Sequence, residues 1–508
     1  MPRALLPISL VLVASCASSS PPPTRFPTDD WPRSTPEAQG IPSSALTSVL
    51  ERVRDEDLHL HELLVVRHET IVLDARVFPY DGSRPHDIAS CTKTLTALAV
   101  GAAIEGGAID GVQTPLLSLF DDVAIANDSA EKRAMTIEDA LTMRSGLTCV
   151  TDPGEVTLMQ MLASPRYVDF ALGLPMESTP GTTWAYCGPA SHLLSAVVGR
   201  ATGEPEDAWL RERIFDRIGV GDVIWPHDPQ GVAHGWGDAR LHAEDLARLG
   251  LLLLHGGAWD GERLLDPAWV AAATTNRVGT AGPAGGYGYQ IWTSGNGAFY
   301  ANGRGGQYVL VVPALDLVVV ALGSASPEEG ATYGQIFASM LGPAVSASAL
   351  PESPSDAAAL EALVAELAMA PAAQTVPTLP AAATDVSGAS YAVGEGPLGW
   401  ERFSLTFDGD TASLAVTIEG ASSTFAVALD GSPRITRGGR FGTDPRHADL
   451  DLAASGRWTS ETSFEVEIDT IDRADAGTLT FTFAGDAVSI VLFERTYLRT
   501  PLTFTGMR

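Results

Sequence analysis

The last quarter of the chain carries the pattern that most restricts its fold. Between residues 386 and 508, apolar and polar side chains alternate in six short runs, several separated by Asp-Gly or Gly-Asp. A period of two is typical of strands that bury one face, and Asp-Gly favours hairpin turns. These residues predict a separate antiparallel β domain, a meander that closes into a sandwich or small barrel. The sequence of this β domain contains no motif that indicates a catalytic or binding site.

Residues 36–344 mix helical and strand patterns instead. Residues 43–58 form an amphipathic helical pattern, residues 61–78 a strand pair, and a helix runs from Ser90 to Glu105 before Gly106-Gly107. Residues 298–323 predict two strands around Pro313. This mixture predicts an α+β domain. Residues 345–385 are rich in Ala, Pro and Ser and predict a linker with one short helix.

The first 35 residues predict export. A short basic beginning precedes an apolar run that is too short to span a bilayer, which is typical of a signal peptide. The run ends at Val13-Ala14-Ser15-Cys16, which resembles a bacterial lipobox. We therefore expect a signal peptide over residues 1–15, a lipid anchor on Cys16 and a tether over residues 16–35. Ala17 after the cysteine favours the outer membrane of a bacterial envelope, facing the periplasm or exterior. The alternative is an ordinary signal peptide with a chance cysteine.

Composition narrows the possible partners. The chain has 508 residues, 45% of them hydrophobic, and a formal net charge of −30. That charge argues against binding nucleic acid or docking electrostatically on anionic lipid, which leaves the lipid anchor as the membrane contact. The histidines and cysteines show no metal-ligand spacing, so we expect neither a metal nor another cofactor.

Lys93 stands out because 30 of the 32 Lys and Arg residues are arginines. Lysine, unlike arginine, can release its proton when it is buried or crowded. Lys132 lies in a charged stretch, and we expect it to be a solvated surface residue. Lys93 follows Ser90 by three residues in an apolar run, which places both side chains on one helix face. A neutral amine beside a serine hydroxyl can act as base and nucleophile.

Further motifs follow in a recognisable order. They are "LTMRSGL" at 141–147, W-x-Y at Trp184 and Tyr186 before a helix, and G-x-G-G-Q at 303–307 before a buried strand. Together with S-x-x-K, this order resembles serine hydrolases of the class C β-lactamase superfamily, including DD-peptidases, esterases and 6-aminohexanoate-dimer hydrolases. The resemblance spans residues 36–341. It implies an antiparallel sheet flanked by helices, with a helical subdomain, and the β domain resembles one appended to many such hydrolases.

The resemblance also implies roles for individual residues. Ser90 becomes acylated, Lys93 accepts its proton, and Tyr186 transfers a proton to the leaving group. The amides of Ser90 and Arg304 form the oxyanion hole. The substrate-binding residues that it implies are Gly188, Trp236, Asn302, Gly303 and Gln307.

Two departures from the family pattern bear on the substrate. Gly188 stands where the family commonly has Asn, and Ala301-Asn302-Gly303 replaces the Lys-Thr-Gly whose lysine helps to bind a substrate carboxylate. Arg304 is a candidate substitute if its side chain faces the pocket. The departures favour an esterase or amidase acting on a less anionic substrate, and we expect that substrate to be a small-molecule or peptide-like ester or amide. The alternatives are a cell-wall peptidase or weak β-lactamase, and a non-enzymatic binding or scaffold lipoprotein.

Three cysteines follow Cys16. In the family's fold, the loops that carry Cys149 and Cys187 both border the active site, and disulfides persist in exported proteins. We therefore expect a Cys149–Cys187 disulfide that fixes the loop of Tyr186, worth roughly 3–4 kcal/mol by loop-closure entropy, with Cys91 as a free thiol. The alternatives are a Cys91–Cys187 pair and three unpaired cysteines.

Overall fold

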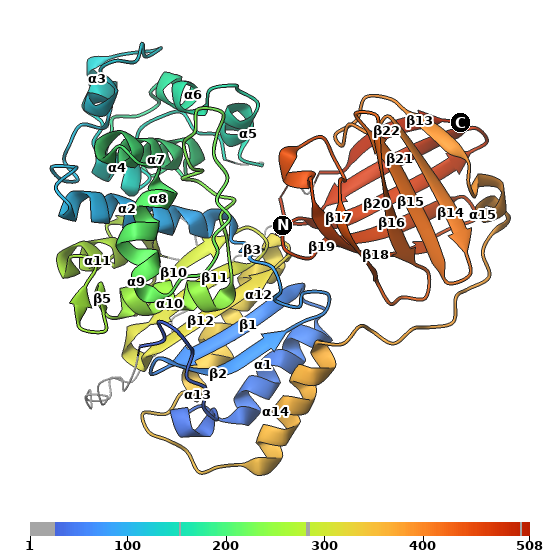
Figure 1. The fold of residues 1–508 in the computed structure, drawn as a ribbon, viewed down its shortest axis with the longest axis horizontal. Helices are drawn as coiled ribbons and strands as arrows, with labels where there is room; N and C mark the ends of the chain where they lie inside the picture. The colour runs from blue at the N-terminus through green and yellow to red at the C-terminus, as the bar shows by residue number, and fades with distance from the viewer. Residues whose placement is uncertain (1–25, 152–153, 281–284, 498–499) are drawn as a thin grey trace, which may run out of the picture.

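The computed structural model describes residues 26–151, 154–280, 285–497 and 500–508, and it contains two domains side by side (Figure 1). The predicted signal peptide and Cys16 lie outside the described residues. The first domain is built on an eight-stranded antiparallel sheet. In spatial order its strands are β2 (Thr70–Arg76), β1 (Leu60–Arg67), β12 (Leu317–Gly323), β11 (Gln307–Val312), β10 (Phe299–Gly303), β9 (Trp292–Thr293), β8 (Gly286–Tyr287) and β7 (Val278–Gly279).

Helices cover both faces of this sheet, which explains the unbroken apolar run of its central strand. Along β12, Val318 and Val320 face a core shared with α2 (Thr92–Glu105) and α10 (Ala243–Leu254). Leu317 and Val319 face a second core, shared with α1 (Ser43–Asp55), α12 (Pro327–Ile336) and α14 (Pro354–Leu367). A strand that is buried on both faces carries apolar side chains at successive positions, so its sequence does not alternate.

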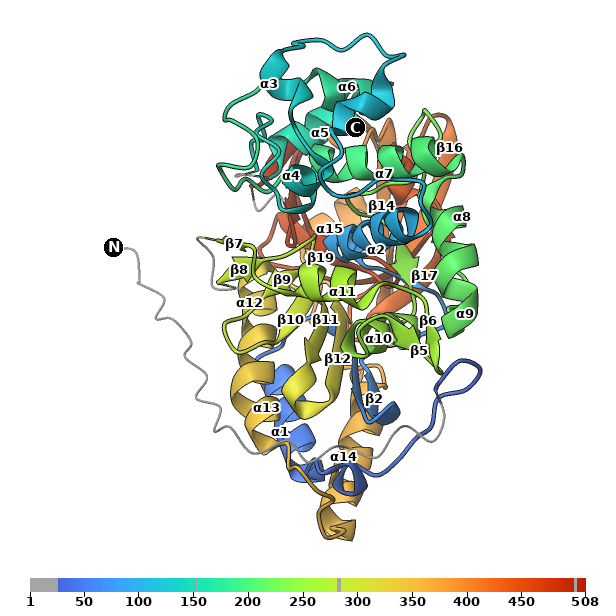
Figure 2. The same ribbon diagram turned by 90° about the vertical axis from the view of Figure 1, so that its left-hand side faces the viewer.

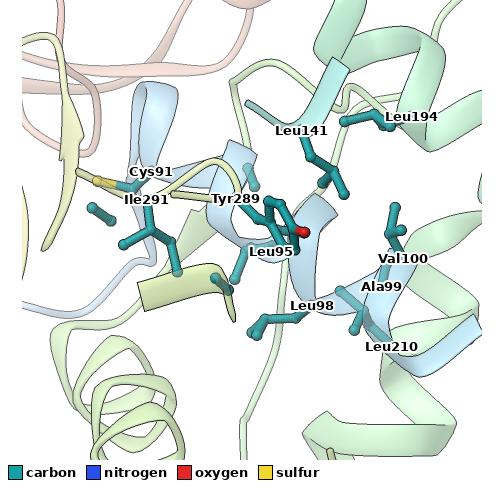
Figure 3. Packing of buried hydrophobic residues seen from close by; sticks show 14 of the residues in the cluster. Cys91, Leu95, Leu98, Ala99, Val100, Leu141, Leu194, Leu210, Tyr289 and Ile291 are labelled. Carbon is teal, nitrogen blue, oxygen red and sulfur yellow. The ribbon is translucent and has the colours of Figure 1, made fainter. Parts of the chain in front are cut away.

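A helical layer covers α2 on the side away from the sheet (Figure 2). Its helices are α3 (Ala130–Arg133), α4 (Ile137–Leu141), α5 (Val156–Leu162), α6 (Tyr167–Gly173) and α7 (Gly188–Thr202). The chain then passes α2 through α8 (Glu206–Leu210) and reaches α9 (Asp216–Ile218) beside α10 (Figure 1). Leu95 and Leu98 of α2 pack among Leu141, Leu210 and Tyr289 (Figure 3). Shorter elements complete the domain: β3 (His86–Asp87), β4 (Arg240–Leu241), β5 (Ala258–Trp259), β6 (Glu262–Arg263), α11 (Pro267–Thr274) and α13 (Gly342–Ala344).

The second domain is an antiparallel barrel. One sheet runs in the order β16-β15-β14-β13-β22-β21-β20-β19-β18-β17, and pairing of β16 with β18 closes its first nine strands. Phe403, Phe425, Phe464 and Phe481 are fully buried inside it. Helix α15 (Ala381–Val386) precedes the strands, which are β13 (Ser390–Val393), β14 (Arg402–Asp408), β15 (Thr411–Ile418), β16 (Ala421–Ala428), β17 (Arg434–Gly439), β18 (Leu450–Trp458), β19 (Ser463–Thr470), β20 (Ala476–Ala484), β21 (Ala487–Glu494) and β22 (Leu502–Met507). Both parts confirm the predicted fold class.

Three local expectations differ from the structure. Lys132 is fully buried rather than solvated, because its Nζ donates to the carbonyl oxygens of Ala126 (3.0 Å) and Leu172 (2.8 Å). Residues 298–323 form three strands rather than two, because the chain also reverses between β10 and β11, with positive φ at Gly305 and Gly306. Helix α14, expected in the linker, packs on α1.

Candidate active site

Ser90 lies at a strained turn before α2. Strand β3 ends at Asp87, and a 3₁₀ turn, η2 (Ala89–Cys91), leads into the helix. Ala89 has φ 45°, a left-handed conformation that costs a non-glycine residue about 1–3 kcal/mol. The Asp87 carboxylate accepts a hydrogen bond from the Ala89 amide at 2.7 Å, which stabilises the turn. The turn leaves Ser90 partly exposed while the residues around it are buried.

Lys93 lies one helical turn further on, with its ammonium group inside the protein. Its Nζ is 3.0 Å from Ser90 Oγ and donates to the carbonyl oxygen of Trp236 at 2.6 Å. Burial lowers the pKa of Lys93 to about 8, although the charges of Glu155 and Asp238 act in the opposite direction. About a tenth of the amine is therefore neutral at pH 7, and this fraction can accept the Ser90 proton.

Tyr186 closes the third side of the cluster. Lys93 Nζ lies 4.7 Å from the centre of its ring, and Trp292 stacks on the ring at 6.1 Å. Burial raises the pKa of Tyr186 well above its ordinary value, although a hydrogen bond with Ser90 acts in the opposite direction. The phenol is therefore neutral at physiological pH and can donate or relay a proton. The structure brings together the three residues that the sequence predicts as catalytic.

The end of β10 runs against the Ser90 turn. A Cβ added to Gly303 would lie 2.6 Å from the carbonyl oxygen of Ile88, so this contact has room for glycine alone. The backbone of Arg304 follows directly, so its amide lies near the turn that carries the amide of Ser90. The Arg304 side chain turns away toward the barrel, where its Nη1 donates to Asp475 Oδ1 at 2.6 Å.

Of the four remaining residues predicted to bind substrate, three lie around the site and one does not. Trp236 supplies the carbonyl oxygen that binds Lys93. Gly188 begins α7, where an added Cβ would meet a Leu158 methyl group at 3.3 Å. The Gln307 amide donates to the carbonyl oxygens of Arg304 and Gly323, so this residue holds the β10–β11 turn. The structure does not bring Asn302 to Ser90.

Asn302 faces the opposite side of the sheet from Ala301 and Gly303. It lies across from Tyr308 in the strand register, and its side chain hydrogen-bonds with Tyr308. The Tyr308 hydroxyl in turn donates to the carbonyl oxygen of Gly330 in α12. Successive strand side chains point to opposite faces, so Asn302 belongs to the layer of α12.

Cys149 and Cys187 form a disulfide in the structure, with Cα atoms 5.5 Å apart, and Cys91 is a buried free thiol. The bond ties the loop after the "SGL" turn to the residue that follows Tyr186. Tyr186 is thereby held through its backbone on the side where the family commonly has an Asn.

The chain also matches a known protein family. The Beta-lactamase family model matches residues 46–336. The chain belongs to the Beta-lactamase family. This membership confirms the resemblance drawn from the motifs.

Relatives of this Beta-lactamase-family chain include amide and ester hydrolases by name. It is 25% identical over 325 residues to a 6-aminohexanoate-dimer hydrolase of Paenarthrobacter ureafaciens, covering 59% of this chain and 82% of that protein. It is 30% identical over 188 residues to a lovastatin esterase of Penicillium rubens, covering 34% and 46%. A putative 6-aminohexanoate-dimer hydrolase from Bacillus anthracis shares the fold, with TM-score 0.51 and 19% identity over 62% of this chain and 87% of that one.

Sequence reasoning on this Beta-lactamase-family chain missed the charged residues around the site. Glu155 and Tyr186 line the same small pocket, and the charge of Glu155 opposes the lowering of the Lys93 pKa. Asp238 accepts from His234 at 3.1 Å and also acts on Lys93. Asp87 lies three residues before Ser90, and this short spacing could have identified it from the sequence as a neighbour of the site. Glu155 and Asp238 carried no local signal, since each reaches the site from its own loop.

Two features are absent from the part of the chain that the structure describes. Within residues 26–508, apart from the gaps given above, no helix is long and apolar enough to cross a membrane. The same residues hold no group of three His, Cys, Asp or Glu side chains placed to bind a metal ion.

Proposed function

We propose that this Beta-lactamase-fold protein is a serine hydrolase that cleaves ester or amide substrates through an acyl-enzyme on Ser90. One observation carries the proposal: Lys93 Nζ, buried and with its pKa lowered to about 8, lies 3.0 Å from Ser90 Oγ. A nucleophile within hydrogen-bond reach of a base with a suitable pKa is the arrangement that acyl transfer needs.

The proposed steps use groups already in contact. Neutral Lys93 takes the Ser90 proton as Oγ attacks the carbonyl carbon, and the amides of Ser90 and Arg304 receive the negative charge on the carbonyl oxygen. Tyr186, a neutral phenol, donates a proton to the leaving alcohol or amine and recovers one from Lys93. Water then attacks the acyl group, with its proton passing back through the same pair to regenerate Ser90.

A probe that reacts with activated serines tests the proposal. After treatment with a fluorophosphonate, peptide mass spectrometry should find the adduct on the peptide that contains Ser90. Heat-denatured protein serves as the control, because the adduct depends on the folded Ser90–Lys93 pair. A folded protein that stays unlabelled, and that also fails to hydrolyse short p-nitrophenyl esters, would favour a scaffold role instead.

The substrate class follows from the missing lysine. Ala301 stands where the family's Lys-Thr-Gly lysine binds a carboxylate, and the Arg304 guanidinium is engaged by Asp475. Esters and amides without a carboxylate at that position are therefore the favoured substrates. The names of the relatives, an amide and an ester hydrolase, agree with this class.

We expect p-nitrophenyl butyrate to be hydrolysed with a kcat/KM about 10- to 100-fold above that for nitrocefin. A lost charge-assisted contact to the substrate carboxylate, worth about 1.5–3 kcal/mol, accounts for a factor of this size. Parallel steady-state assays of both compounds measure the ratio. Efficient nitrocefin turnover with little ester hydrolysis would reverse the ranking in favour of a β-lactamase or cell-wall peptidase.

We further propose that Cys16 carries lipid and holds the protein at a bacterial envelope membrane, because small residues precede it and a Ser/Pro-rich tether follows. The variant Cys16→Ser should move from the membrane fraction to the soluble fraction, as seen by immunoblot of fractionated cells. Cys91→Ser, which alters a cysteine inside the folded domain, is the matched control and should stay with the membranes. An unchanged distribution of the Cys16 variant would place the anchor elsewhere.

A further inference from the structure

One loop of the barrel enters the domain that carries Ser90. It connects β19 to β20 and comprises residues 471–475, called the docking loop below. Its backbone is held to its own domain at both ends: the Ile471 amide donates to the Asp451 carbonyl oxygen at 2.9 Å, and the Thr470 amide to that of Asp475 at 3.2 Å. The loop is therefore a fixed projection of the barrel.

The docking loop binds the strand that leads to Ser90. The amide of Asp87 donates to the carbonyl oxygen of Asp472 at 3.0 Å. Asp87 in turn uses its carboxylate to hold the amide of Ala89, the residue before the nucleophile. A chain of two hydrogen bonds thus runs from the barrel to the turn that presents the Ser90 amide.

The same loop binds the residue whose amide forms the other half of the proposed oxyanion hole. Arg304 Nη1 donates to Asp475 Oδ1 at 2.6 Å and to Thr496 Oγ1 at 3.0 Å, both in the barrel. The charge of Arg304 holds the pKa of Asp475 well below its usual range. The backbone at Gly305 also packs closely against the docking loop, since a Cβ added to Gly305 would lie 2.9 Å from the Cβ of Ala474.

A buried charge cluster lies where the docking loop meets the domain of Ser90. The Asp472 carboxylate is 1% exposed and has Arg84, Arg240 and Arg473 nitrogens at 3.7–3.8 Å. Arg84 and Arg240 come from the domain of Ser90. A carboxylate buried among cations of both domains resists sliding of one domain over the other, because any displacement leaves charge unpaired away from water.

We propose that the docking loop is part of the catalytic apparatus and that Asp475 is a positioning residue. It acts through Arg304 to fix the distance between the Arg304 and Ser90 amides that receive the oxyanion. This inference rests on the proposed function. It assigns the barrel an indirect role in transition-state stabilisation, exerted through Arg304 and the turn that carries Ser90.

The test is a set of variants of the full chain. Asp475→Ala removes the carboxylate that orients Arg304, and Asp475→Asn keeps an acceptor oxygen in its place. Thr496→Val removes the second acceptor of Arg304 and leaves its ion pair with Asp475. This variant replaces Asp475→Ala in the test if the alanine variant folds poorly. The matched control is Asp81→Ala, which breaks an ion pair with Arg437 across the same pair of domains but away from Ser90.

Two readouts separate positioning from general destabilisation. For Asp475→Ala we expect kcat on p-nitrophenyl butyrate to fall about 10- to 100-fold, since loss of a whole oxyanion donor costs about 100- to 1000-fold. KM should stay within about twofold. The inhibition constant of an aryl boronic acid, whose serine adduct is tetrahedral, should rise by the same factor as kcat falls. Thr496→Val should show a smaller loss of the same kind, and Asp475→Asn should recover part of the activity.

The outcomes distinguish the inference from the function on which it rests. Wild-type kcat and boronic acid affinity in Asp475→Ala, with turnover that still depends on Ser90, would overturn the inference alone. An equal loss in Asp81→Ala would also overturn it, since the effect would then be a general one of domain contact. Turnover that survives in Ser90→Ala would overturn the proposed function itself.

Discussion

Replacing Ser90 by alanine should lower ester turnover by at least about a thousandfold while leaving the fold intact. The hydroxyl is the proposed nucleophile, and its removal leaves catalysis by binding and by the oxyanion hole alone. Ser90 is partly exposed at the start of α2, so the lost oxygen leaves no sizeable cavity. The measurement is kcat on p-nitrophenyl butyrate, with thermal unfolding as a check on the fold.

Ser195→Ala is the matched control for this loss. Ser195 is also a helical serine, but it is buried in α7 and donates to the carbonyl oxygen of Ala233. Its replacement should lower stability and leave kcat near the wild-type value. Undiminished turnover in Ser90→Ala would rule out the acyl-enzyme mechanism on this residue.

Lys93→Arg should be nearly as damaging, by about a thousandfold in kcat/KM, although it keeps the positive charge. Arginine does not release its proton in the physiological range, so it cannot accept one from Ser90. In the proposed mechanism the neutral amine of Lys93 is the active form. Since its pKa is lowered to about 8, kcat/KM should rise about tenfold per pH unit below pH 8 and level off above it.

The second lysine provides the control for the first. Lys132→Arg makes the same substitution at another fully buried lysine, whose Nζ is held by two backbone carbonyl oxygens in the helical layer. This variant should lose stability but keep the wild-type pH profile per folded molecule. A fully active Lys93→Arg protein, or a flat profile across pH 8 in the wild type, would contradict the assignment of Lys93 as base.

The features that the sequence predicted are those with a local signature. Strict alternation after residue 386 predicts a β domain because each strand buries one face. Ser90 and Lys93 share a helix face through their spacing alone. Tyr186 was placed by the order of motifs, since its distance from Ser90 depends on how α7 packs against α2.

The errors arose where distant segments supply the partner. Lys132 looked like a surface residue because its neighbours are charged, yet its two acceptors lie 6 and 40 residues away. The contact between Arg304 and Asp475 spans 171 residues and two domains. The run of charge at residues 472–475 interrupts the alternation of the barrel, and it was the one sequence signal that this loop differs from a plain hairpin.

The burial of both lysines has a chemical consequence outside catalysis. The chain has Lys93 and Lys132 as its lysines, and each is at most 1% exposed, so its surface cations are arginines. Reagents that acylate or cross-link amines therefore find no lysine side chain on the folded surface. Lys93, with its pKa lowered to about 8, lies 3.0 Å from the partly exposed Ser90, so a small acylating reagent that reaches Ser90 also comes close to this amine.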